Sequence, residues 1–384
     1  MHTLPQPDRD AVAASAGLVR RIQQEIDLNG GWLPFSRYMD LALYAPGTGY
    51  YTGGSRKFGA DGDFVTAPEI SPFFAAALAQ QIADLLPLTG GDLYEFGAGS
   101  GRLAADLLLA LEAGQALPQR YRIIEVSGEL AARQRECIEQ AAPHLLPRVE
   151  WLEALPACMD GVLIGNEVLD AMPCELILWD AQGTPLQRGV IRAGDGFDWQ
   201  DRPLTDGEAL ARAEALAPGA EYLSELPLAA SAFVRTLGER LERGAVLLLD
   251  YGFPESEFYH PQRRAGTLMC HYRHHTHPDP FSWPGLTDIT CHVDFTAIAQ
   301  AGLDAGLDLA GYTSQAMFLM NCGIAQLLGR LDPEDIANYL PQSTAVQKLL
   351  SPAEMGELFK VIGFSRGLDA GWRGFAVGDR RRNL

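Results

Sequence analysis

The stretch Leu93-Tyr94-Glu95-Phe96-Gly97-Ala98-Gly99-Ser100-Gly101-Arg102 decides the fold of this chain. A short apolar strand pattern is followed by three glycines at alternate positions and then by the start of a helical pattern. Glycines permit a tight turn and the close approach of a ligand, and a helix N-terminus offers free N–H donors. In a dinucleotide-binding loop the third glycine comes one residue later, and a pyrophosphate lies on the helix. Glu95 would repel a pyrophosphate, but it suits a ligand that carries an ammonium group and a sulfonium.

A second acid lies at the end of the next predicted strand, residues 121–126. There a carboxylate can accept hydrogen bonds from both hydroxyls of a ribose. The two acids and the glycines together predict a nucleoside site that needs no phosphate recognition, and therefore S-adenosyl-L-methionine as the cofactor. The residues expected to bind it are Glu95, Gly97, Gly99, Gly101 and Glu125. A purely structural turn and an NAD site are the alternatives to this interpretation.

Outward from this stretch, short apolar runs alternate with amphipathic helices, a pattern that is typical of βαβ units. We therefore expect an α/β fold with one doubly wound, Rossmann-like sheet of the class I methyltransferase type. The expected strands lie at residues 92–96, 121–126, 149–152, 161–165, 245–249 and 307–312, with 375–377 as a final edge strand. The expected helices lie at residues 72–86, 101–113, 128–141, 229–242 and 294–303, with further helices up to 359.

The rest of the chain is expected to form a cap and two insertions. Residues 1–78 predict an N-terminal helical cap, with helices at 9–29 and 35–44 and a loop rich in glycine and tyrosine. Residues 79–384 predict the methyltransferase domain, with insertions at about 172–227 and 252–292. Within the insertions we expect a hairpin at 175–191, a polar stretch at 193–221 with at most one short helix, and a long loop at 253–290. Because connecting segments often carry binding residues, the insertions are the expected place of substrate recognition.

The candidate chemical site follows the fourth predicted strand, in Gly165-Asn166-Glu167-Val168-Leu169-Asp170. In an open α/β sheet, ligands bind beyond the carboxyl ends of the strands, so Asn166 and Glu167 lie where an acceptor would meet the methyl donor. If the acceptor is an arginine, a carboxylate can hold its guanidinium through two N–H bonds. Glu167 is the first candidate for this role and Asp170 the second. The alternative is that Asn166 caps a helix and Glu167 lies in its first turn.

Two further polar residues are expected near the same edge. Asp250 ends the fifth predicted strand, where a simple turn is an equally good interpretation. His292 lies in the stretch Asp288-Ile289-Thr290-Cys291-His292-Val293-Asp294-Phe295, just before a predicted helix. An imidazole titrates near neutrality, so His292 could pair with a carboxylate or accept a proton. A capping or surface role is the alternative for this histidine.

The composition restricts the classes of function. The formal net charge of −19 opposes tight nonspecific binding of nucleic acid and suits a cationic acceptor, although an acidic, solubilising surface is the simpler explanation of the charge alone. The sequence has neither a long apolar run nor a secretion or transit signal, so we expect no membrane span, a cytoplasmic location and reduced cysteines. The histidine-rich stretch from Cys270 to His277 lacks a regularly spaced second pair of ligands, so we expect a polar loop and no metal site.

With these residues assembled, the chain resembles the MidA family, which includes the mitochondrial complex I assembly arginine methyltransferases. The stretches that carry the resemblance run in order along nearly the whole chain, at residues 38–51, 62–69, 95–101, 165–173, 250–252, 266–268 and 288–295. The resemblance implies that S-adenosyl-L-methionine is bound by Gly97, Gly99, Gly101 and Glu125, and that Asn166 and Glu167 line the acceptor site. Thr290-Cys291-His292 is also similar to the Thr-His-Trp loop of arginine methyltransferases, with Thr and His separated and Trp absent.

The leading hypothesis is a methyltransferase that acts on an arginine of a protein. For the mitochondrial members the resemblance implies dimethylation of a complex I subunit, so such a subunit is one expected protein partner. A small-molecule methyltransferase is the alternative among enzymes, and the two insertions argue against it because a small acceptor needs less recognition surface. A cofactor-binding assembly factor with little catalysis is the alternative of another class, and Glu167 at a strand end favours an enzyme.

Overall fold

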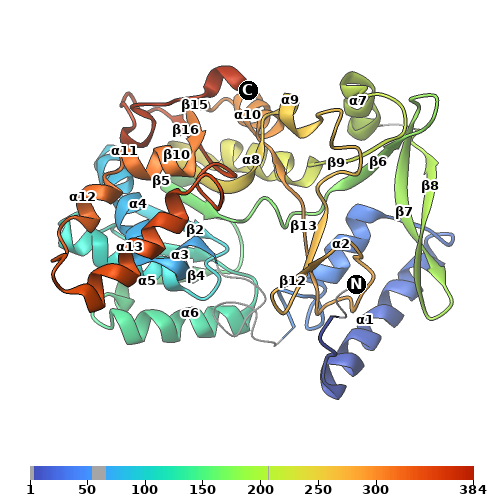
Figure 1. The fold of residues 1–384 in the computed structure, drawn as a ribbon, viewed down its shortest axis with the longest axis horizontal. Coiled ribbons are helices and arrows are strands. Elements are labelled where there is room, and N and C mark those ends of the chain that lie inside the picture. Colours follow the sequence, from blue (N-terminus) through green and yellow to red (C-terminus); the bar gives the residue numbers. More distant parts are fainter. Residues whose placement is uncertain (1–3, 54–65, 206) are drawn as a thin grey trace. The chain divides into compact units, whose positions relative to one another are not determined.

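Residues 4–53, 66–205 and 207–384 are described by the structure, a computed structural model. The chain forms two compact units, each made of three separate stretches (Figure 1). The first unit contains Met1–Phe64, Leu169–Ala232 and Glu255–Asp294, and the second contains Val65–Val168, Phe233–Pro254 and Phe295–Leu384. The expected insertions fall largely in the later stretches of the first unit, while the expected division at residue 78 stays a prediction.

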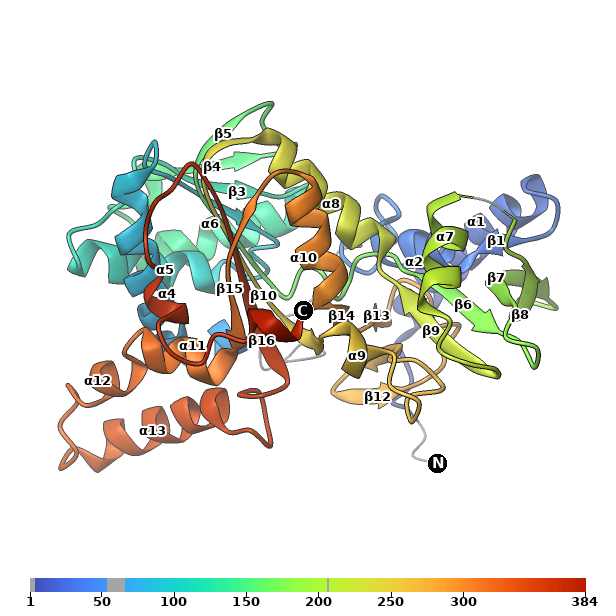
Figure 2. The same ribbon diagram turned by 90° about the horizontal axis from the view of Figure 1, so that it is seen from above.

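The second unit is built on a sheet with the strand order β15-β16-β10-β5-β2-β3-β4 (Figure 2). Its strands are β2 (Asp92–Phe96), β3 (Tyr121–Ile124), β4 (Val149–Leu152), β5 (Met159–Asn166), β10 (Leu241–Phe253), β15 (Asp308–Ser314) and β16 (Phe359–Arg366). Strands β10, β5, β2, β3 and β4 run parallel, and β16 runs antiparallel to β10 and β15. The chain passes from β2 through β3 to β4 and then crosses to β5 on the other side of β2. The expected doubly wound α/β sheet is therefore confirmed, with its switch in strand order between β2 and β5.

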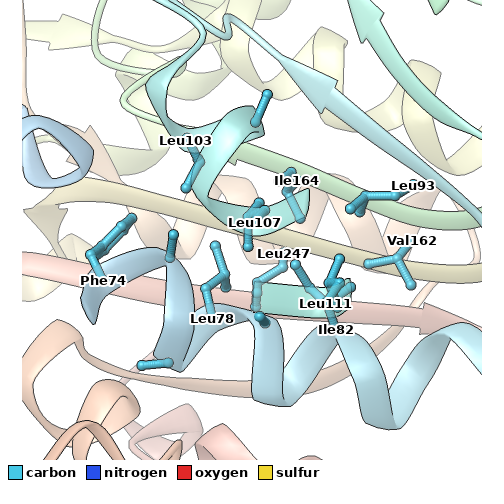
Figure 3. Packing of buried hydrophobic residues seen from close by; sticks show 14 of the residues in the cluster. Phe74, Leu78, Ile82, Leu93, Leu103, Leu107, Leu111, Val162, Ile164 and Leu247 are labelled. Atoms are coloured by element: carbon cyan, nitrogen blue, oxygen red, sulfur yellow. The ribbon is translucent and has the colours of Figure 1, made fainter. Parts of the chain in front are cut away.

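Helices cover both faces of this sheet. They are α3 (Ala67–Ile70), α4 (Pro72–Leu85), α5 (Arg102–Ala113), α6 (Gly128–Ala141), α8 (Leu228–Arg240), α10 (Phe295–Asp304), α11 (Gln315–Asn321), α12 (Ile324–Leu328) and α13 (Ile336–Leu350). On one face, Leu103, Leu107 and Leu111 recur every four residues along α5 and pack with α4 against β2, β5 and β10 (Figure 3). On the other face, Phe233 of α8 contacts Phe96 with 5.2 Å between ring centres. Burial on both sides explains the continuous apolar runs of the central strands.

The first unit has two smaller sheets, one with the order β1-β7-β6-β9 and β8 paired to β7, the other with the order β12-β11-β13. Its elements are α1 (Arg9–Leu28), β1 (Leu33–Pro34), α2 (Phe35–Tyr44), β6 (Glu175–Trp179), β7 (Pro185–Ala193), β8 (Gly196–Pro203), α7 (Gly207–Leu216), β9 (Tyr222–Leu226), α9 (Glu255–Phe258), β11 (Met269–Tyr272), β12 (His275–His277), β13 (Asp288–Thr290) and β14 (Val293–Asp294). Helix α1 begins after Asp8, which accepts a hydrogen bond from the Ala11 N–H at 2.8 Å. Its buried Leu18, Ile22 and Ile26 belong to an apolar core that joins all three stretches of this unit.

The structure corrects several expected elements of the first unit. The stretch 253–290, expected as a loop, contains α9, β11, β12 and β13, which are too short to leave a periodic pattern in the sequence. The polar stretch 193–221 contains the strand β8 as well as the expected helix. The sequence did not predict this strand, because β8 pairs with β7 and keeps polar side chains exposed, so it has no apolar pattern. The hairpin at 175–191 is confirmed as the antiparallel pair β6–β7. The smaller sheets are additions to the single sheet that the sequence predicts.

The expected edge strand at 375–377 is wrong. Arg373–Phe375 forms a 3-10 turn, as do Leu86–Leu88, Leu146–Arg148 and Arg381–Asn383, and the missing strand is β16. The Phe375 ring lies on the sheet itself, where a Cβ added to Gly311 would come within 2.1 Å of it. Phe375 therefore packs as a side chain and does not extend the sheet. Among the described residues, no helix combines the length and the apolar character that crossing a membrane requires.

Candidate active site

The register of the parallel strands gathers three of the expected site residues at one edge of the sheet. Phe96 pairs with Ile124 of β3 and with Gly165 of β5. The residues that come next, Gly97, Glu125 and Asn166, therefore lie side by side at the carboxyl ends of their strands. This is the edge where ligands bind in open α/β sheets, and it adjoins the switch in strand order.

The glycine loop has a conformation that only glycine adopts easily. Gly97, Gly99 and Gly101 have φ angles of +63°, +51° and +85°. A Cβ on Gly101 would come within 2.8 Å of the Gln134 Cα, so this position is also closed to larger residues by contact. Helix α5 starts at the next residue without a side-chain cap, which leaves backbone N–H donors available at the loop.

Glu125 is held in place by hydrogen bonds to both of its carboxylate oxygens. Its Oε1 accepts the Ser127 N–H at 2.8 Å, and its Oε2 accepts from Gln134 Nε2 at 2.9 Å. Burial raises the pKa of Glu125, and the hydrogen bonds from Ser127 and Gln134 oppose that shift. Gln134 also donates to the Gly99 carbonyl at 3.2 Å, so one fully buried side chain connects the acid to the glycine loop.

Two features of this corner are absent from the sequence-based prediction. Gln134 occupies the same face of α6 as Leu130 and Ile138, and a polar residue at such a buried position is a signal that could have revealed it. Val126 directly follows Glu125 and is 72% exposed. An apolar surface next to a carboxylate that can accept from ribose hydroxyls suits the flat face of an adenine ring.

Glu95 lies in the apolar core of the second unit. It is 2% exposed, and its carboxylate accepts a hydrogen bond from the Tyr121 hydroxyl at 2.7 Å. Burial raises the pKa of Glu95 to about 7, while the bond from Tyr121 opposes the shift. At neutral pH the carboxyl group is therefore only partly ionised.

Another acid, Glu69 of α3, reaches the glycine loop. The Ser100 hydroxyl donates a hydrogen bond to Glu69 Oε1. The adjacent cation, Arg102, pairs with Asp106 at 2.7 Å. A pyrophosphate would find no available cation in Arg102, whereas a ligand with an ammonium group would find a carboxylate in Glu69.

The candidate acceptor site at the end of β5 has an unusual backbone. Glu167 has a φ angle of +54°, and its N–H donates to the Leu249 carbonyl at 2.8 Å. Asn166 Nδ2 donates to Glu167 Oε1 at 3.1 Å, whereas Asn166 Oδ1 is buried and accepts no hydrogen bond from the described residues. Fully buried Asp250 accepts the Val168 N–H at 3.1 Å and so anchors the next residue of this turn. Residues 167–174 form no helix, so the helix-cap alternative for Asn166 is wrong.

The other two candidate residues, Asp170 and His292, belong to the first unit. The structure brings their backbones together, because Cys291 N–H donates to the Asp170 carbonyl at 3.0 Å. The His292 N–H donates to Thr267 Oγ1 at 3.0 Å. His292 lies between β13 and β14 and is half-buried, so it neither caps a helix nor lies free on the surface.

A buried carboxylate fixes the segment that carries Thr267. Glu225 of β9 is 1% exposed and accepts hydrogen bonds from the N–H groups of Thr267 and Leu268 at 2.7 and 2.8 Å. A Cβ on Gly266 would come within 2.4 Å of Glu225 Oε1, so this close approach needs a glycine. Sequence reasoning missed Glu225, because β9 is only five residues long and the neighbouring Ser224 is polar as well, so the stretch gives no clear strand pattern.

The histidine-rich stretch forms the β11–β12 hairpin, in which Cys270 pairs with His277. Over residues 4–53, 66–205 and 207–384, no three His, Cys, Asp or Glu side chains are grouped as a metal ion would require. The cysteines at 137, 158, 174, 270, 291 and 322 are all free thiols.

The donors at the edge of the sheet fit S-adenosyl-L-methionine. The loop has open backbone donors, Glu125 can accept from ribose hydroxyls, and Val126 offers an apolar surface to a base. These groups suit a nucleoside and require no phosphate on the ligand.

Comparisons with known proteins agree with this geometry. A family model of S-adenosyl-L-methionine-dependent methyltransferases matches residues 77–313. The chain is 52% identical to a protein from Burkholderia thailandensis whose crystal structure holds S-adenosyl-homocysteine, with a TM-score of 0.96 and all of both chains covered. It is 28% identical to the mitochondrial protein arginine methyltransferase NDUFAF7 homolog of Drosophila melanogaster, over 95% of this chain and 88% of that one. Identity to the Danio rerio NDUFAF7 is 27%, over 86% of this chain and 82% of that one.

Proposed function

The chain belongs to this family of S-adenosyl-L-methionine-dependent methyltransferases, and on that premise we propose that it methylates an arginine side chain of a protein. The resemblance to the MidA family is thereby confirmed, and S-adenosyl-L-methionine is the cofactor. We propose that Gly97, Gly99, Gly101 and Glu125 hold it, together with Gln134, which positions two of them. The cofactor supplies a methyl group made electrophilic by its sulfonium.

The observation that carries the proposal is the backbone of Glu167. A non-glycine residue in the left-handed region costs free energy, and such strain is concentrated at functional sites. Here it lies at the carboxyl edge of the sheet beside the cofactor loop, since a Cβ on Gly97 would be 3.2 Å from Val168 Cγ2. The turn holds a carboxylate where an acceptor would meet the methyl donor.

Glu167 and Asn166 have the chemistry that a guanidinium requires. A carboxylate accepts two parallel N–H bonds from an arginine and thereby orients the third nitrogen for in-line attack. The buried Oδ1 of Asn166 offers a further acceptor for an N–H group. On the sequence argument, Asp170 stays the second candidate for holding the guanidinium, and His292 stays a group that could accept the proton released from the methylated nitrogen.

The nature of the acceptor is supported by the relatives. The Drosophila and Danio proteins are named protein arginine methyltransferases, which favours a protein over a small molecule. A respiratory complex I subunit as the acceptor is part of the proposal and rests on the family resemblance. These relatives are also named mitochondrial, whereas the cytoplasmic location expected here stays a prediction that fractionation would test.

The test is transfer of tritiated methyl from S-adenosyl-L-methionine into a lysate of cells that lack this protein. We expect a labelled protein band with the wild type and methylarginine after acid hydrolysis of that band. Glu167→Gln should lower the rate on the order of 100-fold, because the amide cannot accept two N–H bonds, while the affinity for S-adenosyl-homocysteine stays close to wild type.

Glu221→Gln is the matched control. Glu221 has nearly the same backbone conformation, with a φ of +53°, but it is exposed and lies in the first unit. This variant should transfer methyl groups at the wild-type rate. If the label appears in a small molecule, the methyl acceptor is a metabolite and not a protein. Full activity of Glu167→Gln would refute the proposed role of Glu167 in holding the guanidinium. Normal partner assembly without any transfer would favour a noncatalytic assembly factor.

A further inference from the structure

The glycine-loop pattern indicates Glu95 as the acid for the ammonium group of the cofactor, but this carboxylate has another environment. Glu95 lies on the same face of β2 as Leu93, which packs in the apolar core of the second unit (Figure 3). It is 2% exposed and already accepts a hydrogen bond from Tyr121. Burial raises the pKa of Glu95 to about 7, because the apolar surroundings disfavour the ionised carboxylate. The ammonium group therefore needs another acid.

Glu69 has the properties that Glu95 lacks. It is half-buried, and Ser100 of the glycine loop donates a hydrogen bond to its Oε1. Its Oε2 accepts no hydrogen bond from the described residues. Arg102, the cation close enough to interact with it, forms its ion pair with Asp106.

We propose that Glu69 binds the ammonium group at the methionine end of S-adenosyl-L-methionine. The Ser100 hydroxyl fixes one carboxylate oxygen at the loop, and the other oxygen accepts an N–H bond from the ligand. Ser100 is a positioning residue, because it acts on the ligand through Glu69. The inference rests on the cofactor part of the proposed function and is independent of the acceptor.

Two ligands separate recognition of the ammonium group from recognition of the nucleoside. S-adenosyl-homocysteine carries the ammonium group, and 5′-methylthioadenosine has the same nucleoside and sulfur but no amino acid. Calorimetric titration gives the Kd of each ligand for the wild type, Glu69→Gln, Ser100→Ala and Glu95→Gln. Binding of 5′-methylthioadenosine also shows that each variant retains a folded nucleoside site.

We expect Glu69→Gln to weaken S-adenosyl-homocysteine roughly tenfold to hundredfold, the size of a lost hydrogen bond between charged groups. The Kd of 5′-methylthioadenosine should change by less than about twofold, because that ligand makes no contact with Glu69. Ser100→Ala should weaken only S-adenosyl-homocysteine, by a smaller factor. Glu95→Gln should leave the ratio of the two Kd values unchanged.

Three results would overturn the assignment. Unchanged affinity of Glu69→Gln for S-adenosyl-homocysteine would remove Glu69 from the site. Equal weakening of both ligands would mean that Glu69 shapes the loop and does not bind the ammonium group. A selective loss in Glu95→Gln would return the role to Glu95. None of these titrations needs a methyl acceptor, so the inference can fail while the proposed arginine methylation stands, and the reverse.

Discussion

Glu95 is a carboxylic acid in an apolar core, and this couples the stability of the fold to pH. Its pKa rises from 4.5 to about 7 in the folded chain. Below about pH 4.5 it is protonated in both the folded and the unfolded chain and costs no stability. As the pH rises toward 7, the unfolded chain releases this proton first, so stability falls. Above about pH 7 the ionised, buried carboxylate lowers the free energy of unfolding by its full amount, about 3 kcal/mol.

Glu95→Gln should remove this loss, because glutamine stays neutral and can still accept the Tyr121 hydrogen bond. Thermal unfolding followed by circular dichroism should give midpoints close to the wild type near pH 5 and a higher midpoint at pH 8. Glu153→Gln, at an exposed glutamate, is the control and should follow the wild type at both values. A Glu95→Gln midpoint below the wild type at pH 8 would contradict the buried-acid argument.

At the same scale, some features of the candidate site could be predicted from the sequence and others could not. The positions of the loop glycines and Glu125 at the carboxyl edge of the sheet were predictable, because they follow from the local strand, turn and helix pattern. The contacts of Gln134 and Glu69 with the loop were not predictable, because their partners there are 35 and 31 residues away in the chain. Only the fold brings those side chains to the cofactor edge.

At the scale of elements, the amphipathic helices and the apolar central strands could be predicted, and β16 could not. Helix α5 shows leucines every four residues, and the structure begins and ends it within one residue of the expected bounds. Strand β16 is buried along nearly its whole length, but Lys360, Gly363 and Ser365 interrupt the continuous apolar run that made β5 and β10 visible in the sequence. That glycine is required by packing, because a Cβ there would come within 2.7 Å of the Phe375 ring.

The attachment of residues 266–268 to β9 gives a prediction at this scale. Glu225→Ala would leave the N–H groups of Thr267 and Leu268 without their acceptor, at a cost of about 2–4 kcal/mol. Glu225→Gln retains one oxygen for both N–H groups and should cost much less. Hydrogen exchange should show faster exchange at residues 266–268 and at His292 in the alanine variant alone. Equal protection in both variants would mean that other contacts hold this segment.

At the scale of the whole molecule, the apolar core of the first unit depends on all three of its stretches. Removal of residues 1–64 would take away α1 and α2 and leave Leu176, Val190 and Ile289 without much of their packing. We expect that truncated chain to accumulate in the insoluble fraction on expression. Removal of residues 1–7, which keeps the Asp8 cap, should leave the protein in the soluble fraction. A soluble, cooperatively melting chain without residues 1–64 would show that the rest of the first unit folds without them.

This dependence also has a consequence in time. Leu18 and Ile289 belong to one core but are separated by roughly 270 residues of chain. A ribosome adds about 5–20 residues per second, so α1 leaves the exit tunnel tens of seconds before its last core partners exist. During that interval its apolar face is open to other nascent chains and to holding chaperones. The pace of translation therefore influences the yield of native protein as well as the energy of the finished fold.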